Sequence, residues 1–199
     1  MKNSYFFTAL KITLSLFLIC GVIAGAVALA FSVTINKYNE NVANEKSNAI
    51  AEIFREPGAE APELTLDDVD LPEKSPKSVK EVSKVLVDEK NVIGYAINIT
   101  GKGFGGEISL MIGYNADGSI RGVKIISHAE TPGVGTKATT NEHLSQYNQK
   151  SGELTISKKK GDDIAAVSGA TISSKAIHAA VNEANKLIIK VINEGGSAQ

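Results

Sequence analysis

The chain has 199 residues, room for one domain of ordinary size and a smaller segment, with a formal net charge of −1. This charge balance argues against a nucleic-acid partner, which would usually require a strongly basic face. The one cysteine, Cys20, excludes an internal disulfide framework and lies inside an apolar run.

That apolar run extends without a charged residue from Ile12 to Ile35, between Lys11 and Lys37. About 20 apolar residues cross a bilayer, so we predict one transmembrane helix over about 12–35, within an N-terminal segment 1–37. A cleavable signal peptide is the alternative, because alanines recur between 24 and 30. Lysines precede the run without nearby acids, which predicts a cytoplasmic N-terminus, a single pass and an extracytoplasmic remainder.

Residues 38–78 are predicted to form a short helix followed by a spacer. The helix covers 38–54, where apolar residues recur at helical intervals. Four of the five prolines fall between Phe54 and Val79, together with a run of acidic residues. Proline removes a donor and disfavours helix in the preceding residue, so this stretch is expected to be extended.

Residues 79–199 are predicted to form an α+β domain in which helices pack on an antiparallel sheet. We expect a strand or short helix over 82–87 and strands over 92–99, 108–114 and 120–127, the last two joined by a turn at Asp117-Gly118. Shorter elements follow: a helix over 141–148, strands over 154–156 and 164–167, and a solvated turn at Lys158–Lys160. An amphipathic helix from Ile172 to about Asn193 closes the chain.

Two loops of this domain contain small residues in patterns that suggest binding. Residues 101–106 read Gly-Lys-Gly-Phe-Gly-Gly and match G-x-G-x-x-G, but β-rich residues follow where a dinucleotide site requires a helix. We therefore expect a hairpin loop. Residues 128–135 read His-Ala-Glu-Thr-Pro-Gly-Val-Gly, a turn that either contacts a ligand or is merely solvated. His128 and Glu130 have no further ligand at suitable spacing, so we predict no metal site.

The stretch from Ser168 to Ser174, Ser-Gly-Ala-Thr-Ile-Ser-Ser, leads directly into the closing helix. Free N–H groups at a helix start suit a phosphate, and Gly169 permits a close approach. Two alternatives exist. Ser168 or Thr171 merely caps the helix, or Ser168 is a hydrolase nucleophile, although it lacks the flanking glycines of a nucleophile elbow.

In this order, the anchor, the spacer, Gly103-Phe104-Gly105-Gly106, the 128–135 loop and Ser168-Gly169-Ala170-Thr171 resemble the G subunits of Rnf ion-translocating electron-transport complexes. The NqrC subunits of sodium-pumping NADH:quinone oxidoreductases share this flavin domain and form an alternative. The resemblance implies FMN joined through its phosphate to Thr171 by a flavin transferase that uses FAD. The motif of the family usually has an acid six residues before the threonine, where this chain has Ala165.

The resemblance also implies the cofactor contacts and the partners. The expected cofactor-binding residues are Thr171 with its neighbours Ser168, Gly169, Ala170, Ile172, Ser173 and Ser174, and the loop residues Glu130, Thr131, Pro132, Gly133 and Gly135. The flavin carries the redox chemistry, so no catalytic acid, base or metal is expected. The implied partners are membrane lipid, the transferase and other Rnf subunits in the cell (inner) membrane, including a second subunit that carries FMN. In such complexes electrons run between ferredoxin and NAD, and this transfer is coupled to sodium or proton movement. A tethered binding module without redox activity is the alternative from another class.

Overall fold

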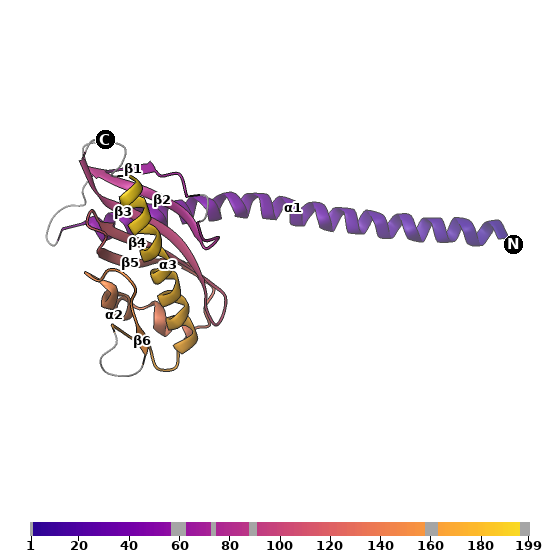
Figure 1. Cartoon of the computed structure of the whole chain (residues 1–199). Coiled ribbons are helices and arrows are strands. Elements are labelled where there is room, and N and C mark those ends of the chain that lie inside the picture. The colour runs from indigo at the N-terminus through magenta and orange to yellow at the C-terminus, as the bar shows by residue number, and fades with distance from the viewer. Residues whose placement is uncertain (1, 57–62, 73–74, 88–90, 158–162, 196–199) are drawn as a thin grey trace. The chain divides into compact units, whose positions relative to one another are not determined.

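The computed structural model describes residues 2–56, 63–72, 75–87, 91–157 and 163–195 (Figure 1). The chain divides into two compact units, Met1–Asn44 and Glu45–Gln199. Helix α1 (Lys2–Phe54) begins in the first unit and ends in the second, so the helix expected over 38–54 is its continuation. The part Leu10–Phe54 is long and apolar enough to cross a membrane, and its most apolar window has no buried residue.

The second unit contains a five-stranded antiparallel sheet in the order β1-β2-β3-β4-β5. The strands are β1 (Leu64–Asp68), β2 (Val79–Val87), β3 (Asn91–Lys102), β4 (Glu107–Asn115) and β5 (Ile120–His128). The four strands predicted after residue 79 are confirmed, and the first of them is a strand rather than a helix. The turn at Asp117-Gly118 is also confirmed, with Gly118 at φ 82°.

The second unit begins at Glu45, well before the predicted domain start at residue 79. Strand β1 lies inside the predicted spacer and pairs with β2, from Leu64 opposite Val87 to Asp68 opposite Ser83. Its side chains are mostly exposed, so backbone pairing rather than burial places it in the sheet. Prolines flank this strand without interrupting it, which fits an edge position.

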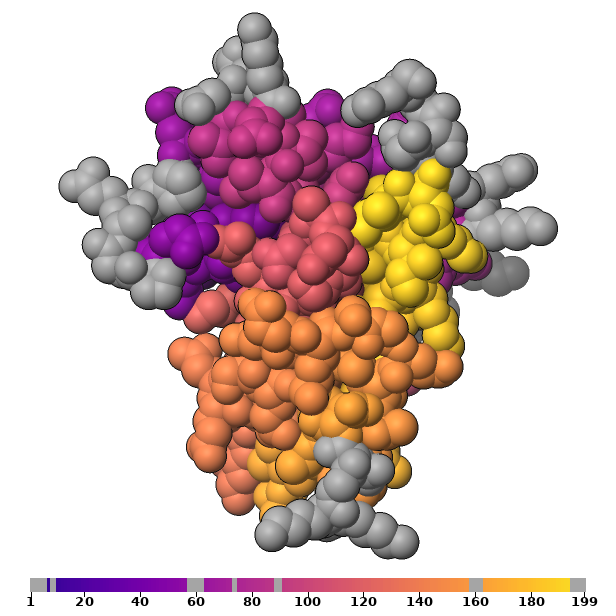
Figure 2. All heavy atoms as spheres, turned by 60° about the vertical axis from the view of Figure 1, so that its left-hand side comes forward, coloured from indigo at the N-terminus to yellow at the C-terminus, as the bar shows by residue number. Residues whose placement is uncertain are grey.

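The remaining elements are short except for the last helix. They are η1 (Gly135–Thr139), α2 (Asn141–Leu144), η2 (Ser145–Tyr147), the parallel pair β6 (Ile156–Ser157) and β7 (Ile164–Ala165), and α3 (Thr171–Gly195). The helix predicted over 141–148 is thus one α turn followed by a 3-10 turn. In Figure 2 the segment coloured orange, which includes α2 and η2, occupies one continuous region beside the C-terminal part of α3 in yellow. Lys158–Lys160 lies outside the described residues.

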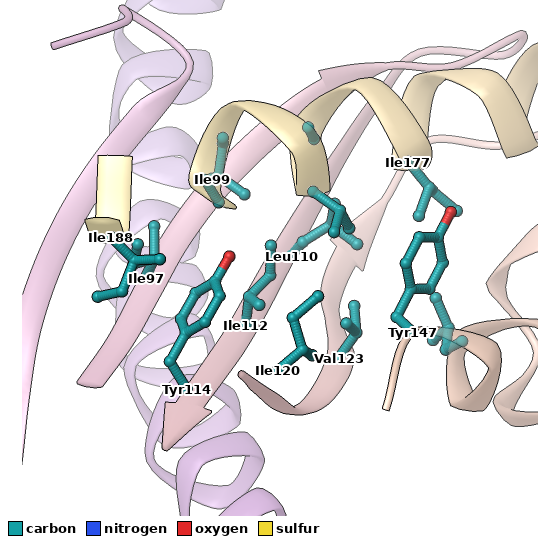
Figure 3. Packing of buried hydrophobic residues seen from close by; sticks show 14 of the residues in the cluster. Ile97, Ile99, Leu110, Ile112, Tyr114, Ile120, Val123, Tyr147, Ile177 and Ile188 are labelled. Atoms are coloured by element: carbon teal, nitrogen blue, oxygen red, sulfur yellow. The ribbon is translucent and has the colours of Figure 1, made fainter. Parts of the chain in front are cut away.

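Helix α3 covers one face of the sheet. Side chains two residues apart on β3 and β4 share a face, and Ile97, Ile99, Leu110 and Ile112 point toward α3 (Figure 3). All four are fully buried, as is Ile177 on the helix. Burial of such a side chain stabilises the fold by roughly 1.5–3 kcal/mol, so this layer is the main core.

The opposite face of the sheet receives the end of α1. A Cβ added to Gly113 would lie 2.4 Å from Ile53 Cγ2, and one on Gly94 2.9 Å from Phe54 Cε1. Glycine is therefore needed where the helix approaches the strands. Arg121 on β5 donates from Nε to the Ile53 carbonyl (3.2 Å) and from Nη2 to the Phe54 carbonyl (3.3 Å), which satisfies the last carbonyls of α1.

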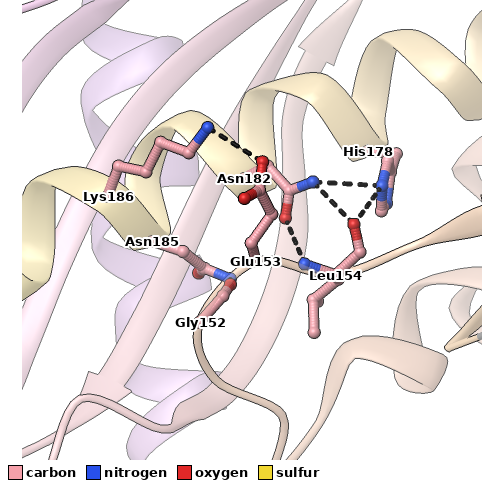
Figure 4. Close-up of polar contacts among 7 residues, drawn as sticks. All are labelled: Gly152, Glu153, Leu154, His178, Asn182, Asn185 and Lys186. Carbon is pink, nitrogen blue, oxygen red and sulfur yellow. Dashed lines mark hydrogen bonds and ion pairs between the residues drawn. The ribbon is translucent and has the colours of Figure 1, made fainter.

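A polar seam fixes α3 against residues 152–154 (Figure 4). The Asn182 amide accepts from the Leu154 N–H and donates to the Leu154 carbonyl, both at 2.9 Å. These bonds occupy the backbone of Leu154, and the strand predicted over 154–156 accordingly begins only at Ile156. Asn185 donates to the Gly152 carbonyl (2.7 Å) and accepts from the buried Tyr114 hydroxyl (2.8 Å).

Candidate functional site

The start of α3 is built by backbone contacts and not by a capping hydroxyl. Gly169 has φ 80°, a conformation that favours glycine, and the Ala170 N–H donates to the Val167 carbonyl (3.1 Å). The first helical bond runs from the Ser174 N–H to the Ala170 carbonyl (2.9 Å). Ala170 therefore occupies the N-cap position, where serine, threonine, aspartate or asparagine is usual.

The alternative that Ser168 or Thr171 caps the helix is therefore wrong. Ala170 has no side-chain acceptor, and Thr171 is already the first helical residue. The N–H groups of Thr171, Ile172 and Ser173 precede the first helical bond, and α3 has no acidic residue in its first turn. The end of a long helix thus presents donors and a positive dipole without an anion of its own.

A hollow of about 340 Å³ opens beside these donors. Thr171 lines it together with Gly169, Ala170, Ile172, Ser173, Phe104 and Val134. Phe104 (57% exposed) and Ile172 (56%) are among the exposed large apolar side chains of this unit. The hollow thus combines an anion-binding helix end, a hydroxyl and apolar walls, a donor set that fits the phosphate and the ring of FMN.

Glu130 lies behind this hollow and does not line it. The carboxylate is buried (6% exposed) and accepts the N–H of Phe104 at Oε1 (2.9 Å) and that of Gly105 at Oε2 (3.1 Å). A Cβ on Gly103 or on Gly135 would lie only 1.6 Å from a carboxylate oxygen. The 101–106 loop and the 128–135 loop therefore both pack against the carboxylate of Glu130.

The loop after Glu130 is a tight turn whose carbonyl at Thr131 accepts from the N–H groups of Val134 (3.2 Å) and Gly135 (3.1 Å). Gly133 has φ 73° and donates to the Thr136 hydroxyl (2.9 Å). Pro132 and Gly133 are exposed, and Val134 is the residue of this loop that lines the hollow. Thr131, Pro132, Gly133 and Gly135 therefore do not line the hollow; they form the turn that positions Val134.

The predicted residues of the Ser168–Ser174 stretch separate into two groups. Gly169 to Ser173 line the hollow, whereas Ser168 is exposed outside its lining and Ser174 is buried, with its hydroxyl accepting the Val167 N–H (3.1 Å). Sequence reasoning missed Phe104 and Val134 as lining residues. An aromatic side chain inside a glycine-rich loop was the available signal for Phe104.

The glycine-rich loop is a hairpin connection, as predicted. Lys102 pairs with Glu107 across it, and the Gly103 N–H donates to the Gly106 carbonyl (2.8 Å). The loop approaches α3, because the Phe104 N–H is also 3.4 Å from the Ser173 hydroxyl oxygen. Next to it, the His128 Nδ1 accepts the Glu130 N–H (3.3 Å) within the 128–135 turn.

A cation lies next to the helix start. The Lys137 ammonium is 3.6 Å from the position of a Cβ on Gly169 and also borders a second hollow of about 400 Å³. His143 lines that second hollow, and burial lowers the pKa of its imidazole. Burial also lowers the pKa of His178 on α3. Both histidines flank the ring of the fully buried Tyr147.

Fold and site define the class: an FMN-binding domain that follows a long apolar helix. A family model described as FMN-binding domain matches residues 103–186, which contain most of the glycine-rich loop, the whole 128–135 loop and Thr171. The crystal structure of Shewanella oneidensis NqrC has the same fold, with a TM-score of 0.50 at 24% identity over 66% of this chain and 70% of that one.

Three relatives are G subunits of oxidoreductase complexes. That of the proton-translocating ferredoxin:NAD(+) oxidoreductase of Clostridium ljungdahlii is 39% identical over 46% of this chain and about half (51%) of its own length. That of the Na(+)-translocating complex of Acetobacterium woodii is 33% identical over 86% of this chain and 87% of its own. The G subunit of the ion-translocating complex of Methanosarcina acetivorans is 31% identical over 87% of this chain and 91% of its own length. The chain belongs to this family, the G subunits of ion-translocating oxidoreductase complexes of the Rnf type.

Proposed function

We propose that this chain carries FMN on Thr171 and transfers electrons within an Rnf-type ferredoxin:NAD oxidoreductase complex. The observation that carries the proposal is the start of α3. Thr171 lines a hollow at a helix end whose N-cap residue, Ala170, offers no acceptor. An alanine N-cap costs about 1 kcal/mol relative to serine or aspartate, and a phosphate at this position would offset that cost.

The linkage is a phosphodiester between the Thr171 oxygen and the ribityl chain of FMN. A flavin transferase would form it from FAD: the threonyl O–P bond forms, the pyrophosphate bond breaks, AMP leaves and the hydroxyl proton is released. The remaining negative charge would be held by the N–H groups of Thr171, Ile172 and Ser173. The Ser174 N–H is not among these donors, because it forms the first helical bond.

FMN supplies one- and two-electron redox chemistry when bound, so the protein needs to supply position and environment. Phe104, Val134 and Ile172 form the apolar walls that would exclude water from one side of the ring. Ser173, fully buried, ties the helix to the Phe104 backbone. No hydrogen bond joins Ser168 to a histidine within the described part of the chain, which weighs against a hydrolase.

The membrane context sets the partners. The apolar part of α1 would anchor the chain in the cell (inner) membrane with its N-terminus in the cytoplasm and the FMN domain on the extracytoplasmic side. There the domain would exchange electrons with other membrane subunits, including one with a second covalent FMN. Relatives named for a ferredoxin:NAD(+) oxidoreductase, at 30% identity or more, favour an Rnf-type complex over an NqrC-type one.

The test is co-expression of the full chain with a flavin transferase, followed by intact mass and visible spectroscopy in detergent. We expect an FMN adduct and a flavin spectrum for the wild type and for Thr171→Ser, and neither for Thr171→Ala. Ser168→Ala, which removes an exposed hydroxyl three residues away, is the matched control and should remain yellow. A colourless wild type would favour the binding module without redox activity, and an adduct that survives Thr171→Ala would refute the site.

A further inference from the structure

Glu130 contacts two of the segments around the hollow, the β3–β4 hairpin and the start of η1, and the hairpin in turn approaches α3. Its carboxylate accepts the N–H groups of Phe104 and Gly105 from the β3–β4 hairpin. The same Phe104 N–H lies 3.4 Å from the hydroxyl oxygen of Ser173 on α3. Gly135, at the start of η1, presses against the other side of the carboxylate. One side chain thereby sets the positions of the loops that carry Phe104 and Val134.

The charge of Glu130 is balanced by backbone donors and not by a cation. Among the residues that the structure describes, no lysine, arginine or histidine forms an ion pair with this buried carboxylate. Burial of an unpaired charge is costly, and backbone N–H groups on both oxygens offset only part of the cost. A glutamine could accept one of these two N–H groups, but its NH₂ would face the other donor. The packing therefore selects a carboxylate at this position.

The negative charge of Glu130 exerts an electrostatic effect on any group bound in the hollow. Its Oε1 accepts the backbone N–H of Phe104, a lining residue, and the carboxylate is buried, so water and salt screen its charge less than they would an exposed one. A fixed anion disfavours addition of an electron to a neighbouring group. The carboxylate would thus make a flavin at Thr171 harder to reduce.

We propose that Glu130 is a positioning residue that holds Phe104 and Val134 around the hollow and whose negative charge lowers the reduction potential of the flavin. This inference rests on the proposed attachment of FMN to Thr171. Glu130 would act on the flavin in two ways: it holds the Phe104 backbone in place, and its charge contributes to the electric field at the hollow. That role replaces the direct cofactor contact expected from the sequence.

The experiment is a redox titration of the flavinylated full chain in detergent. We expect Glu130→Gln to favour reduction at least tenfold, which for a two-electron couple is a positive shift of about 30 mV. Glu130→Asp keeps the charge, so its potential should stay close to the wild-type value. Its shorter side chain should loosen the Phe104 loop and increase quenching of flavin fluorescence by iodide. Glu107→Gln removes an exposed carboxylate from the same hairpin and should leave the potential unchanged.

A second measurement uses only the wild type, in case Glu130→Gln does not fold. The reduced-minus-oxidised infrared difference spectrum of protein labelled with ¹³C-glutamate should contain an isotope-sensitive carboxylate band. Absence of that band, or equal potentials for Glu130→Gln and wild type, would overturn this inference while FMN remains on Thr171. A wild type without FMN on Thr171 overturns the proposed function itself, and the two failures are thereby distinguishable.

Discussion

Gly113→Ala is the substitution that most directly tests how the end of α1 is seated on the sheet. The added Cβ would lie 2.4 Å from Ile53 Cγ2 and 3.0 Å from Phe54 Cε2, closer than real side chains tolerate. Neither side chain can withdraw easily, because both are buried and Arg121 holds their backbone carbonyls. Overpacking of this kind costs about 1–3 kcal/mol. For a unit of this size, a cost of about 2 kcal/mol lowers the Tm by roughly 4–8 °C.

The assay is thermal unfolding of the full chain in detergent, followed by near-ultraviolet circular dichroism of the tyrosines. Gly122→Ala on the neighbouring strand is the matched control, because its Cβ would lie 3.4 Å from the nearest atoms of Ile53. We expect this control to change stability by less than about 0.5 kcal/mol. Equal melting temperatures for Gly113→Ala and Gly122→Ala would refute the close contact that we infer from the structure.

Three further predictions concern charge and buried polar groups. Burial lowers the pKa values of His143 and His178 from 6.5, so the unfolded chain binds protons more readily than the folded one. Stability should therefore fall as the pH drops below about 6.5. The urea midpoint should be lower at pH 5 than at pH 7.5, and this difference should be smaller in His143→Gln. Lys137→Gln should slow flavinylation several-fold in a mass-spectrometric time course while Lys137→Arg retains the rate; equal rates for all three would contradict a role of the cation. Tyr114→Phe leaves the buried Asn185 oxygen without its donor and should cost about 1–3 kcal/mol in urea unfolding.

Much of the fold was predictable because its signals are local. Strands β2 to β5 show apolar runs bounded by turn residues, and Asp117-Gly118 marks their last hairpin. Strand β1 was missed because Leu-Thr-Leu-Asp-Asp exposes most of its side chains, so only its backbone partner identifies it. The approach of Ile53 to Gly113 is a contact across 60 positions that helical periodicity does not reveal.

The site divides in the same way. The helix start at Thr171 follows from a small-residue turn before an amphipathic run, and the structure places it at the hollow. The position of Glu130 could not be predicted, because its partners are backbone N–H groups some 25 residues earlier in the chain. Backbone donors carry no residue type, so such a contact leaves no pattern in the sequence apart from Gly103 and Gly135, which make room for the carboxylate.

The most direct test of the central claim is fragmentation of the tryptic peptide 161–175 from protein that has matured with its transferase. This peptide lies between Lys160 and Lys175 and contains Ser168, Thr171, Ser173 and Ser174, so the fragment ions must distinguish four hydroxyls. We predict that the FMN mass is confined to the fragments that include Thr171. An unmodified peptide, or FMN on one of the three serines, would contradict the account.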